Sequence, residues 1–194
     1  MKRKTIAGLL LALLAIAAPA LAHDRTALDD DDSAGPLDIV AARATHRNGA
    51  IQVRVVTYEE WSDATLSGAL NYVRFDLTKP GRYRVVRCVV IRVESADGED
   101  PVAWQGSIYK DCRAPLPYAN EIGSVRSVVR PDAHSLRAVV DAATVWKNPS
   151  AAFDFRAVTS FEDEDHPRCQ PPNPVPPEHF LGTCWDVTSW RRHN

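Results

Sequence analysis

Most of the sequence consists of short runs in which apolar and polar residues alternate, each closed by a turn. Eight such runs are recognisable, at 37–45, 51–58, 70–78, 83–93, 102–109, 125–130, 135–141 and 152–161. A period of two is typical of strands that bury one face. Only 58–67 and 142–148 have room for a helical turn, and regularly alternating β and α patterns are absent. We therefore predict an all-β fold, an antiparallel β-sandwich of Greek-key or jelly-roll type with about eight strands.

The clearest turn signal is Asn48-Gly49, between the first two runs. If these are the two loop residues, the numbers of opposite residues add up to 97. One face then pairs small residues with larger ones, and we assign it to the core: Ala44 with Val53, Ala42 with Val55 and Val40 with Thr57.

On the other face of this hairpin, two arginines lie directly opposite each other. They are Arg43 and Arg54, flanked by the pairs Ala41 with Val56 and Ile39 with Tyr58. Like charges in opposite positions are destabilising unless an acid joins them. Two interpretations stay open: long side chains splayed into solvent, or an anion site.

The first 22 residues have the form of a secretory signal peptide. Residues 2–4 are basic, 6–18 are apolar, and 20–22 offer a small-residue cleavage site. The apolar run is too short to cross about 30 Å of hydrocarbon, and no second such segment follows it. We predict a secreted or extracytoplasmic protein with no membrane span, exported by the bacterial Sec-type route.

Charge is concentrated near the start of the exported chain. The formal net charge is −2, with a calculated pI of 6.3, which disfavours a basic nucleic-acid binder. Removing the leader takes away three positive charges, so −2 becomes −5. Residues 23–38 alone sum to −5, from six aspartates and one arginine, and the body from 39 onward is formally neutral.

This acidic segment is the best candidate for a metal ligand, and calcium is the ion it would suit. Its ligands would come from a run of four acids, Asp29, Asp30, Asp31 and Asp32. The spacing of a hand-type calcium loop fails, because Ala34 stands where glycine is required and Val40 where a glutamate belongs. A calcium site would therefore need further acids, such as Asp163, Asp165 or Asp186. The alternative is a flexible acidic segment that only solubilises; no cofactor is required.

Four cysteines in an exported chain predict two disulfides. We favour the local pairs, Cys88 with Cys112 and Cys169 with Cys184, since the first pair flanks a hairpin whose turn at 96–101 lies nearly midway between them.

The second pair has a competing interpretation as a zinc site. His166, Cys169, His179 and Cys184 offer two imidazoles and two thiols, the donors of a tetrahedral centre. This spacing matches no standard zinc finger, and oxidation competes for the thiols outside the cytoplasm. We prefer the disulfide.

The domain organisation follows from these patterns. After the leader we expect an acidic N-terminal segment at 23–36, a sandwich domain at 37–161 and a Pro-rich, disulfide-linked strap at 162–194.

Motifs for catalysis are mostly missing. The sequence lacks nucleophile-elbow, zinc-helix, phosphate-loop and dinucleotide fingerprints. Glu59, Glu60 and Asp63 could supply the paired carboxylates of a glycosidase, although such neighbours are more often a solvated face. His134, close to an acid and a hydroxyl, is better explained by a tight turn. We assign no catalytic residue.

The opening Gly35-Pro36-Leu37-Asp38-Ile39, preceded by the acidic run, resembles that of a loosely defined group of uncharacterised secreted bacterial β-sandwich domains. These open with an acidic segment and a Leu-Asp-Ile strand, and close with a Pro-rich loop between cysteines. The likeness covers 29–58 and 168–186, and a more distant one links the same opening to calcium-associated jelly-roll binding modules. The resemblance implies a fold and a location, but no activity.

Two functional classes follow. The first is a non-catalytic binding or structural module for an unknown extracellular or cell-envelope protein or glycan, assisted by calcium, with an aromatic platform drawn from Trp61, Trp104, Tyr118 or Trp185. The second is a small secreted hydrolase that uses the acidic residues at 59–63. Acids that converge in a pocket with perturbed pKa would favour the hydrolase, and an exposed aromatic platform would favour the binder.

Overall fold

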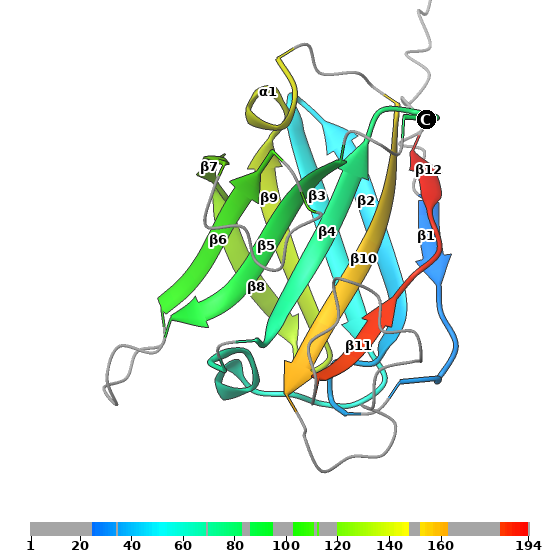
Figure 1. Ribbon diagram of the computed structural model, residues 1–194, viewed down its shortest axis with the longest axis vertical. Helices are drawn as coiled ribbons and strands as arrows, with labels where there is room; N and C mark the ends of the chain where they lie inside the picture. Colours follow the sequence, from blue (N-terminus) through cyan, green and yellow to red (C-terminus); the bar gives the residue numbers. More distant parts are fainter. Residues whose placement is uncertain are drawn as a thin grey trace, which may run out of the picture.

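Two antiparallel sheets pack face to face in the computed structural model, which confirms the predicted β-sandwich (Figure 1). The structure describes residues 25–33, 35–68, 70–82, 86–94, 103–110, 112, 120–147, 152–162 and 183–193.

The first sheet has five strands in the order β1-β2-β3-β9-β8. Their bounds are β1 Arg25–Leu28, β2 Ile39–Arg47, β3 Ala50–Thr57, β8 Ser127–Asp132 and β9 Ser135–Asp141. The second sheet has the order β11-β10-β4-β5-β6-β7, and β12 also pairs with β10. Its strands are β4 Tyr72–Thr78, β5 Val86–Glu94, β6 Ala103–Tyr109, β7 Glu121–Ser124, β10 Phe153–Glu162, β11 Thr183–Val187 and β12 Arg191–His193.

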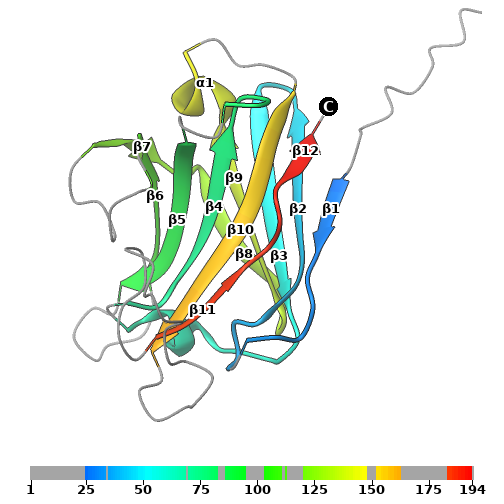
Figure 2. The same ribbon diagram turned by 45° about the vertical axis from the view of Figure 1, so that its right-hand side comes forward.

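The chain crosses between the sheets three times, and this produces a Greek-key order. Strands β4, β5 and β6 follow one another, and β10 returns much later to lie beside β4. The spatial order β10-β4-β5-β6 is that of a Greek key. In both views β1 and β12 lie side by side along one open edge of the sandwich (Figures 1 and 2).

The expected number of strands is wrong, because the described residues form twelve rather than about eight. Four strands were missed: β1, β7, β11 and β12. Each has three to five residues and lies at or near the edge of a sheet. Such strands are held mainly by backbone hydrogen bonds, and these leave no alternating pattern in so few residues.

The hairpin of β2 and β3 has the predicted register. Arg47 pairs with Ala50, and the sum of 97 holds as far as Ala41 and Val56. Asn48 and Gly49 both have positive φ, 51° and 74°, as a two-residue hairpin turn requires.

The same register fails at the start of β2. A β-bulge between Ile39 and Ala41 pairs Ile39, rather than Val40, with Thr57. Ile39 therefore lies in the core with none of its surface exposed, and its predicted place on the outer face is wrong.

The core lies between the sheets and is continuous. Phe75, Phe153 and Phe155 are its largest fully buried side chains. The short helices η1 Asp63–Leu66 and α1 Ala142–Val145 fall within the two segments for which helical turns were expected, and each contributes buried side chains.

The first predicted disulfide is confirmed. Cys88 in β5 is bonded to Cys112, which follows β6, with their Cα atoms 5.6 Å apart. Cys184 is also disulfide-bonded. Its expected partner Cys169 lies outside the described residues, so that pairing stays a prediction. Residues 163–182, most of the expected strap, also lie outside the described residues. Strands β11 and β12 belong to the described part of that strap.

Across the described ranges, no helix has the length and apolar character needed to span a membrane.

Candidate metal site

Three carboxylates come together between strand β11 and the connection that joins β1 to β2. Asp32 and Asp38 belong to the connection, and Asp186 belongs to β11. Each offers one oxygen, and these three oxygens all lie within 4.8 Å of one another. We call these residues the acidic cluster.

Hydrogen bonds hold the connection and β11 against each other. The Ile39 N–H donates to Asp186 Oδ2 over 2.6 Å, and the Val187 N–H donates to Asp186 Oδ1 over 2.6 Å. The Ser33 hydroxyl donates to the Trp185 carbonyl over 3.1 Å. The position of Asp186 is therefore fixed by the backbone on both sides.

Two members of the acidic cluster are buried. Asp38 is 4% exposed and Asp186 is 5% exposed, whereas Asp32 is exposed to solvent. Asp38 Oδ1 is buried and has no hydrogen-bond partner among the described residues. Asp29 Oδ2 is also buried and also lacks a partner there. A buried carboxylate oxygen without a donor is costly, and such an atom in a native fold calls for an explanation such as an ion or a water.

The electrostatics of the acidic cluster agree with its geometry. Burial, followed by repulsion from Asp186 and a hydrogen bond between the Asp38 and Asp31 side chains, raises the pKa of Asp38 from 3.8 to about 7. Burial likewise raises the pKa of Asp186 from 3.8 to about 6, with repulsion from Asp29 and Asp32 adding to it. The pKa of Asp29 is also raised, first by burial. Neighbouring buried carboxyls thus oppose one another's ionisation.

Such a site suits a small hard cation. A cation would neutralise the repulsion between the carboxylates, and the Asp38 oxygen that lacks a hydrogen-bond donor would become one of its ligands. The hollow beside the cluster has essentially no space for a water-sized sphere, so it cannot hold an organic ligand. Its described lining is Ser33, Leu37, Asp38, Thr159, Phe161, Cys184 and Asp186.

The acidic residues expected from the sequence are only partly brought together. Of the run at 29–32, Asp32 lies in the cluster, Asp29 and Asp31 interact with its buried members, and Asp30 is exposed. Asp186 is one of the additional acids that we expected. Asp163 and Asp165 lie outside the described residues.

Asp38 was missed as a ligand. Its position at the start of the first predicted strand, directly before β2, was the available signal, because an acid there is placed by the sheet that follows it.

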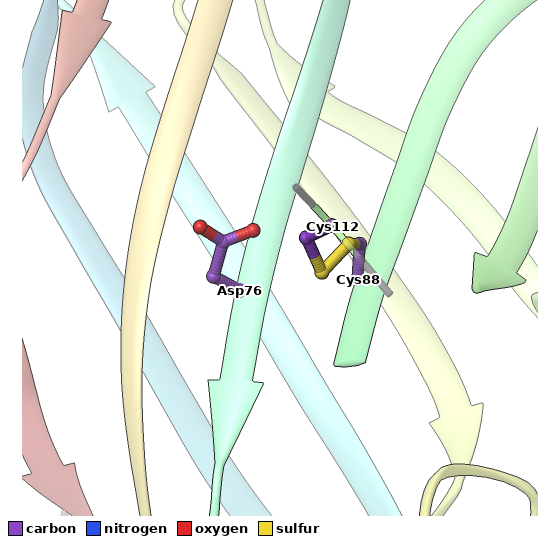
Figure 3. A group of neighbouring side chains, drawn as sticks. All are labelled: Asp76, Cys88 and Cys112. Carbon is purple, nitrogen blue, oxygen red and sulfur yellow. A yellow bond between two sulfur atoms is a disulfide. The ribbon is translucent and has the colours of Figure 1, made fainter. Parts of the chain in front are cut away.

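A second group of potential ligands, Asp76, Cys88 and Cys112, does not form an open metal site (Figure 3). Both sulfur atoms are used in the disulfide. Asp76 is held by arginines, with Arg74 Nε 2.9 Å from Oδ1 and Arg156 Nε 2.8 Å from Oδ2. The carboxylate is therefore already neutralised by two guanidinium groups.

The acids of the hydrolase alternative do not converge. Glu59 and Glu60 are exposed, and Glu60 lies 3.7 Å from the ring of His134. Asp63 is paired with Arg130 over 2.8 Å. Arg130 also lies 4.2 Å above the ring of Trp61 and donates to its carbonyl, so this pair ties the 58–67 segment to β8.

His134 occupies the tight turn that the sequence predicted. Its N–H donates to Asp132 Oδ1 over 3.0 Å, and its carbonyl accepts from Thr57. Ser135 is fully buried and accepts from Arg54 rather than from a histidine.

The expected aromatic platform is not present among the described aromatic residues. Trp61 is buried and meets Trp104 edge to face, with ring centroids 6.4 Å apart. Trp185 is half-buried. It packs against a small apolar cluster on the outer face of the second sheet, which consists of Tyr72, Cys88, Val90, Tyr109, Cys112 and Val158. Tyr118 lies outside the described residues, as do His166 and His179 of the zinc alternative.

Comparison with known proteins found no matching family model, no matching curated protein and no matching solved structure. The resemblance to secreted bacterial sandwich domains therefore stays a prediction.

Proposed function

We propose that this protein is an exported, non-catalytic β-sandwich module that binds an extracellular or cell-envelope partner and uses calcium as a structural ion. The acidic cluster of Asp32, Asp38 and Asp186 is the proposed calcium site. The observation that carries the proposal is the buried Asp38 oxygen that lacks a hydrogen-bond donor and lies among other carboxylates.

Calcium fits this arrangement better than magnesium. Calcium accepts six to eight oxygen ligands in flexible geometry, whereas magnesium requires a near-ideal octahedron and gives up its water reluctantly. The three carboxylates come from two separate parts of the chain, and Asp32 at the rim is exposed, which leaves room for water ligands. Because extracellular calcium sites work at affinities of about 10⁻⁴–10⁻³ M, export is consistent with this role.

The ion would act as a clamp. It would join the acidic connection before β2 to β11, two segments already linked by the Ile39 N–H and the Asp186 carboxylate. Closing this contact fixes the N-terminal edge of the first sheet against the C-terminal edge of the second. The confirmed disulfide between β5 and the end of β6 stabilises the opposite side of the second sheet.

Calorimetric titration of the chelator-treated protein with CaCl₂, repeated with MgCl₂, tests this proposal. We expect calcium to bind with a dissociation constant in the range of about 10⁻⁴–10⁻³ M and magnesium to bind more weakly. Asp38→Asn should weaken calcium binding about tenfold or more, because it removes the charge of the unpartnered ligand.

The matched control is Glu59→Gln, which removes an exposed charge from a different loop and should leave calcium binding unchanged. Two results would contradict the proposal: no heat and no change in melting temperature at millimolar calcium, or equal calcium binding by Asp38→Asn and the parent protein.

A further inference from the structure

The outer face of the first sheet carries a row of arginines that crosses three neighbouring strands. Arg43 in β2 pairs directly with Arg54 in β3, and Arg54 pairs directly with Arg137 in β9. The sequence revealed only the first of these pairs, because β9 lies about 80 residues further along the chain. Like charges at directly opposite positions destabilise a sheet, so three in a row calls for an explanation.

These arginines line a groove of about 500 Å³. Its described lining is Arg43, Thr45, Arg47, Asn48, Ala50, Gln52, Arg54, Pro131, Arg137 and Val139. Four of the lining residues are arginines, and the lining contains no aspartate or glutamate. Arg43, Arg47 and Arg137 are exposed, and no acid in the described ranges is paired with Arg47 or Arg137.

Part of this positive charge is compensated within the protein, because Arg54 is paired and Arg43 also has an interaction of its own. Arg54 lies 3.2 Å from Asp132, which borders the groove, and donates to the Ser135 hydroxyl. Arg137 has no acidic partner within the ranges that the structure describes. The groove therefore presents a surplus of positive charge on a chain whose overall charge is negative.

We propose that this groove binds an acidic polysaccharide, with the arginine row pairing to carboxylates on successive sugar rings. Neighbouring strands lie about 4.8 Å apart, so the row extends over about 10 Å. A single small anion would engage only part of it, whereas a chain with one carboxylate per ring can engage it all. Guanidinium groups bind carboxylates in a two-point geometry, and the amides and hydroxyl of Asn48, Gln52 and Thr45 suit the sugar hydroxyls.

Other polyanions fit less well. Single-stranded nucleic acids are bound through aromatic side chains on which bases stack, and the described lining contains no aromatic residue. Peptide partners are normally held by buried apolar anchors, and this lining offers only Ala50, Pro131 and Val139 as apolar residues. The proposal uses residues separate from the acidic cluster and does not depend on calcium.

Calorimetric titration in the presence of a chelator tests it, with a hexamer of galacturonic acid as the probe. Cellohexaose serves as the neutral comparison, and tripolyphosphate, a hexa-aspartate peptide and a thymidine oligonucleotide serve as other anions. We expect the galacturonate hexamer to bind most tightly and cellohexaose not to bind. Arg137→Gln should weaken binding about tenfold, and Arg137→Lys should restore only part of it, because lysine keeps the charge but loses the two-point geometry.

The matched control is Arg82→Gln, an exposed arginine in the turn after β4, which should leave the affinity unchanged. The proposal is overturned if the hexamer does not bind at about 1 mM, a concentration that would reveal even weak association. It is also overturned if cellohexaose or another anion binds as tightly as the hexamer, or if Arg137→Gln and Arg82→Gln behave alike. Melting curves of both variants verify that they fold.

Discussion

Like charges gather in two places on this molecule, and the two places differ in their contact with water. In the acidic cluster, Asp38 and Asp186 are buried, and burial together with repulsion from neighbouring aspartates raises the pKa of both carboxyls. In the groove, Arg43 and Arg137 are exposed, so solvent screens their repulsion.

The difference shows what each collection of charge can do. A buried cluster gains from a compact ion that replaces lost hydration, so it suits a permanent structural ligand. An exposed row keeps its charge at low cost and can exchange a large, hydrated ligand. A third place, the Arg74–Asp76–Arg156 group, shows buried charge that is already compensated within the chain.

The largest effect should come from breaking that compensated group. Asp76→Asn leaves two arginines facing each other on the outer face of the second sheet, where Asp76 is fully buried and Arg74 is 7% exposed. We expect the free energy of unfolding to fall by about 3–5 kcal/mol, as when one partner of a buried ion pair is removed. Urea unfolding measures it.

Asp141→Asn is the control, because Asp141 and its partner Arg126 are about half exposed. Its loss should cost at most about 1 kcal/mol. If both variants lose the same unfolding free energy, burial does not make the ion pairs of Asp76 more stabilising than the exposed pair of Asp141.

The next effect concerns Asp38→Asn in the metal-free protein. Because the change removes a buried charge that repels Asp186, we expect the melting temperature in chelator to rise by a few degrees. In a chain of this length about 1 kcal/mol corresponds to roughly 2–4 °C. Asp30→Asn, an exposed neighbour, should change it little. A lower melting temperature for Asp38→Asn would mean that its charge is stabilising without an ion.

The metal-free protein should also lose stability as the pH rises. Asp38 and Asp186 have folded pKa values of about 7 and about 6, above 3.8, so between about pH 4 and pH 7 the folded state binds protons that the unfolded state releases. The free energy of unfolding from these two groups therefore falls with increasing pH over that window. Urea unfolding in chelator from pH 4.5 to 8 measures it, and Asp38→Asn should show a shallower fall. An equal slope in the variant would contradict the assignment.

The smallest effect is expected in the groove. Arg137→Gln relieves a like-charge contact with Arg54, so the unfolding free energy should stay the same or rise by at most about 1 kcal/mol. Thermal unfolding without ligand measures it, with Arg82→Gln alongside. A clear loss of stability would show that Arg137 has a structural role.

The sequence predicted those parts of the fold that local patterns specify. The Asn48-Gly49 turn defined a register that holds along most of the hairpin, because both residues take the positive φ that this turn needs. The bulge at the start of β2 left no such signal, since Ile39 is placed by the buried Asp186 carboxylate, 147 residues away. Edge strands such as β1 and β11 depend in the same way on distant partners.

The candidate sites were predictable to different degrees. An acidic run drew attention to Asp29–Asp32, yet burial decides which carboxylates matter. The buried Asp38 shares a small hollow with residues of β10 and β11, which lie more than 120 positions further along the chain. Likewise, Arg43 and Arg54 follow from one hairpin, whereas Arg137 joins the row only through the pairing of β3 with β9.

Calorimetric titration of the protein with calcium at about pH 6.5, in two buffers that differ in ionisation enthalpy, tests the calcium clamp most directly. At that pH Asp38, with a pKa of about 7, is partly protonated. We expect saturable binding of one calcium ion with release of protons, seen as a difference in heat between the buffers. Absence of binding at millimolar calcium, or binding with the same heat in both buffers, would contradict it.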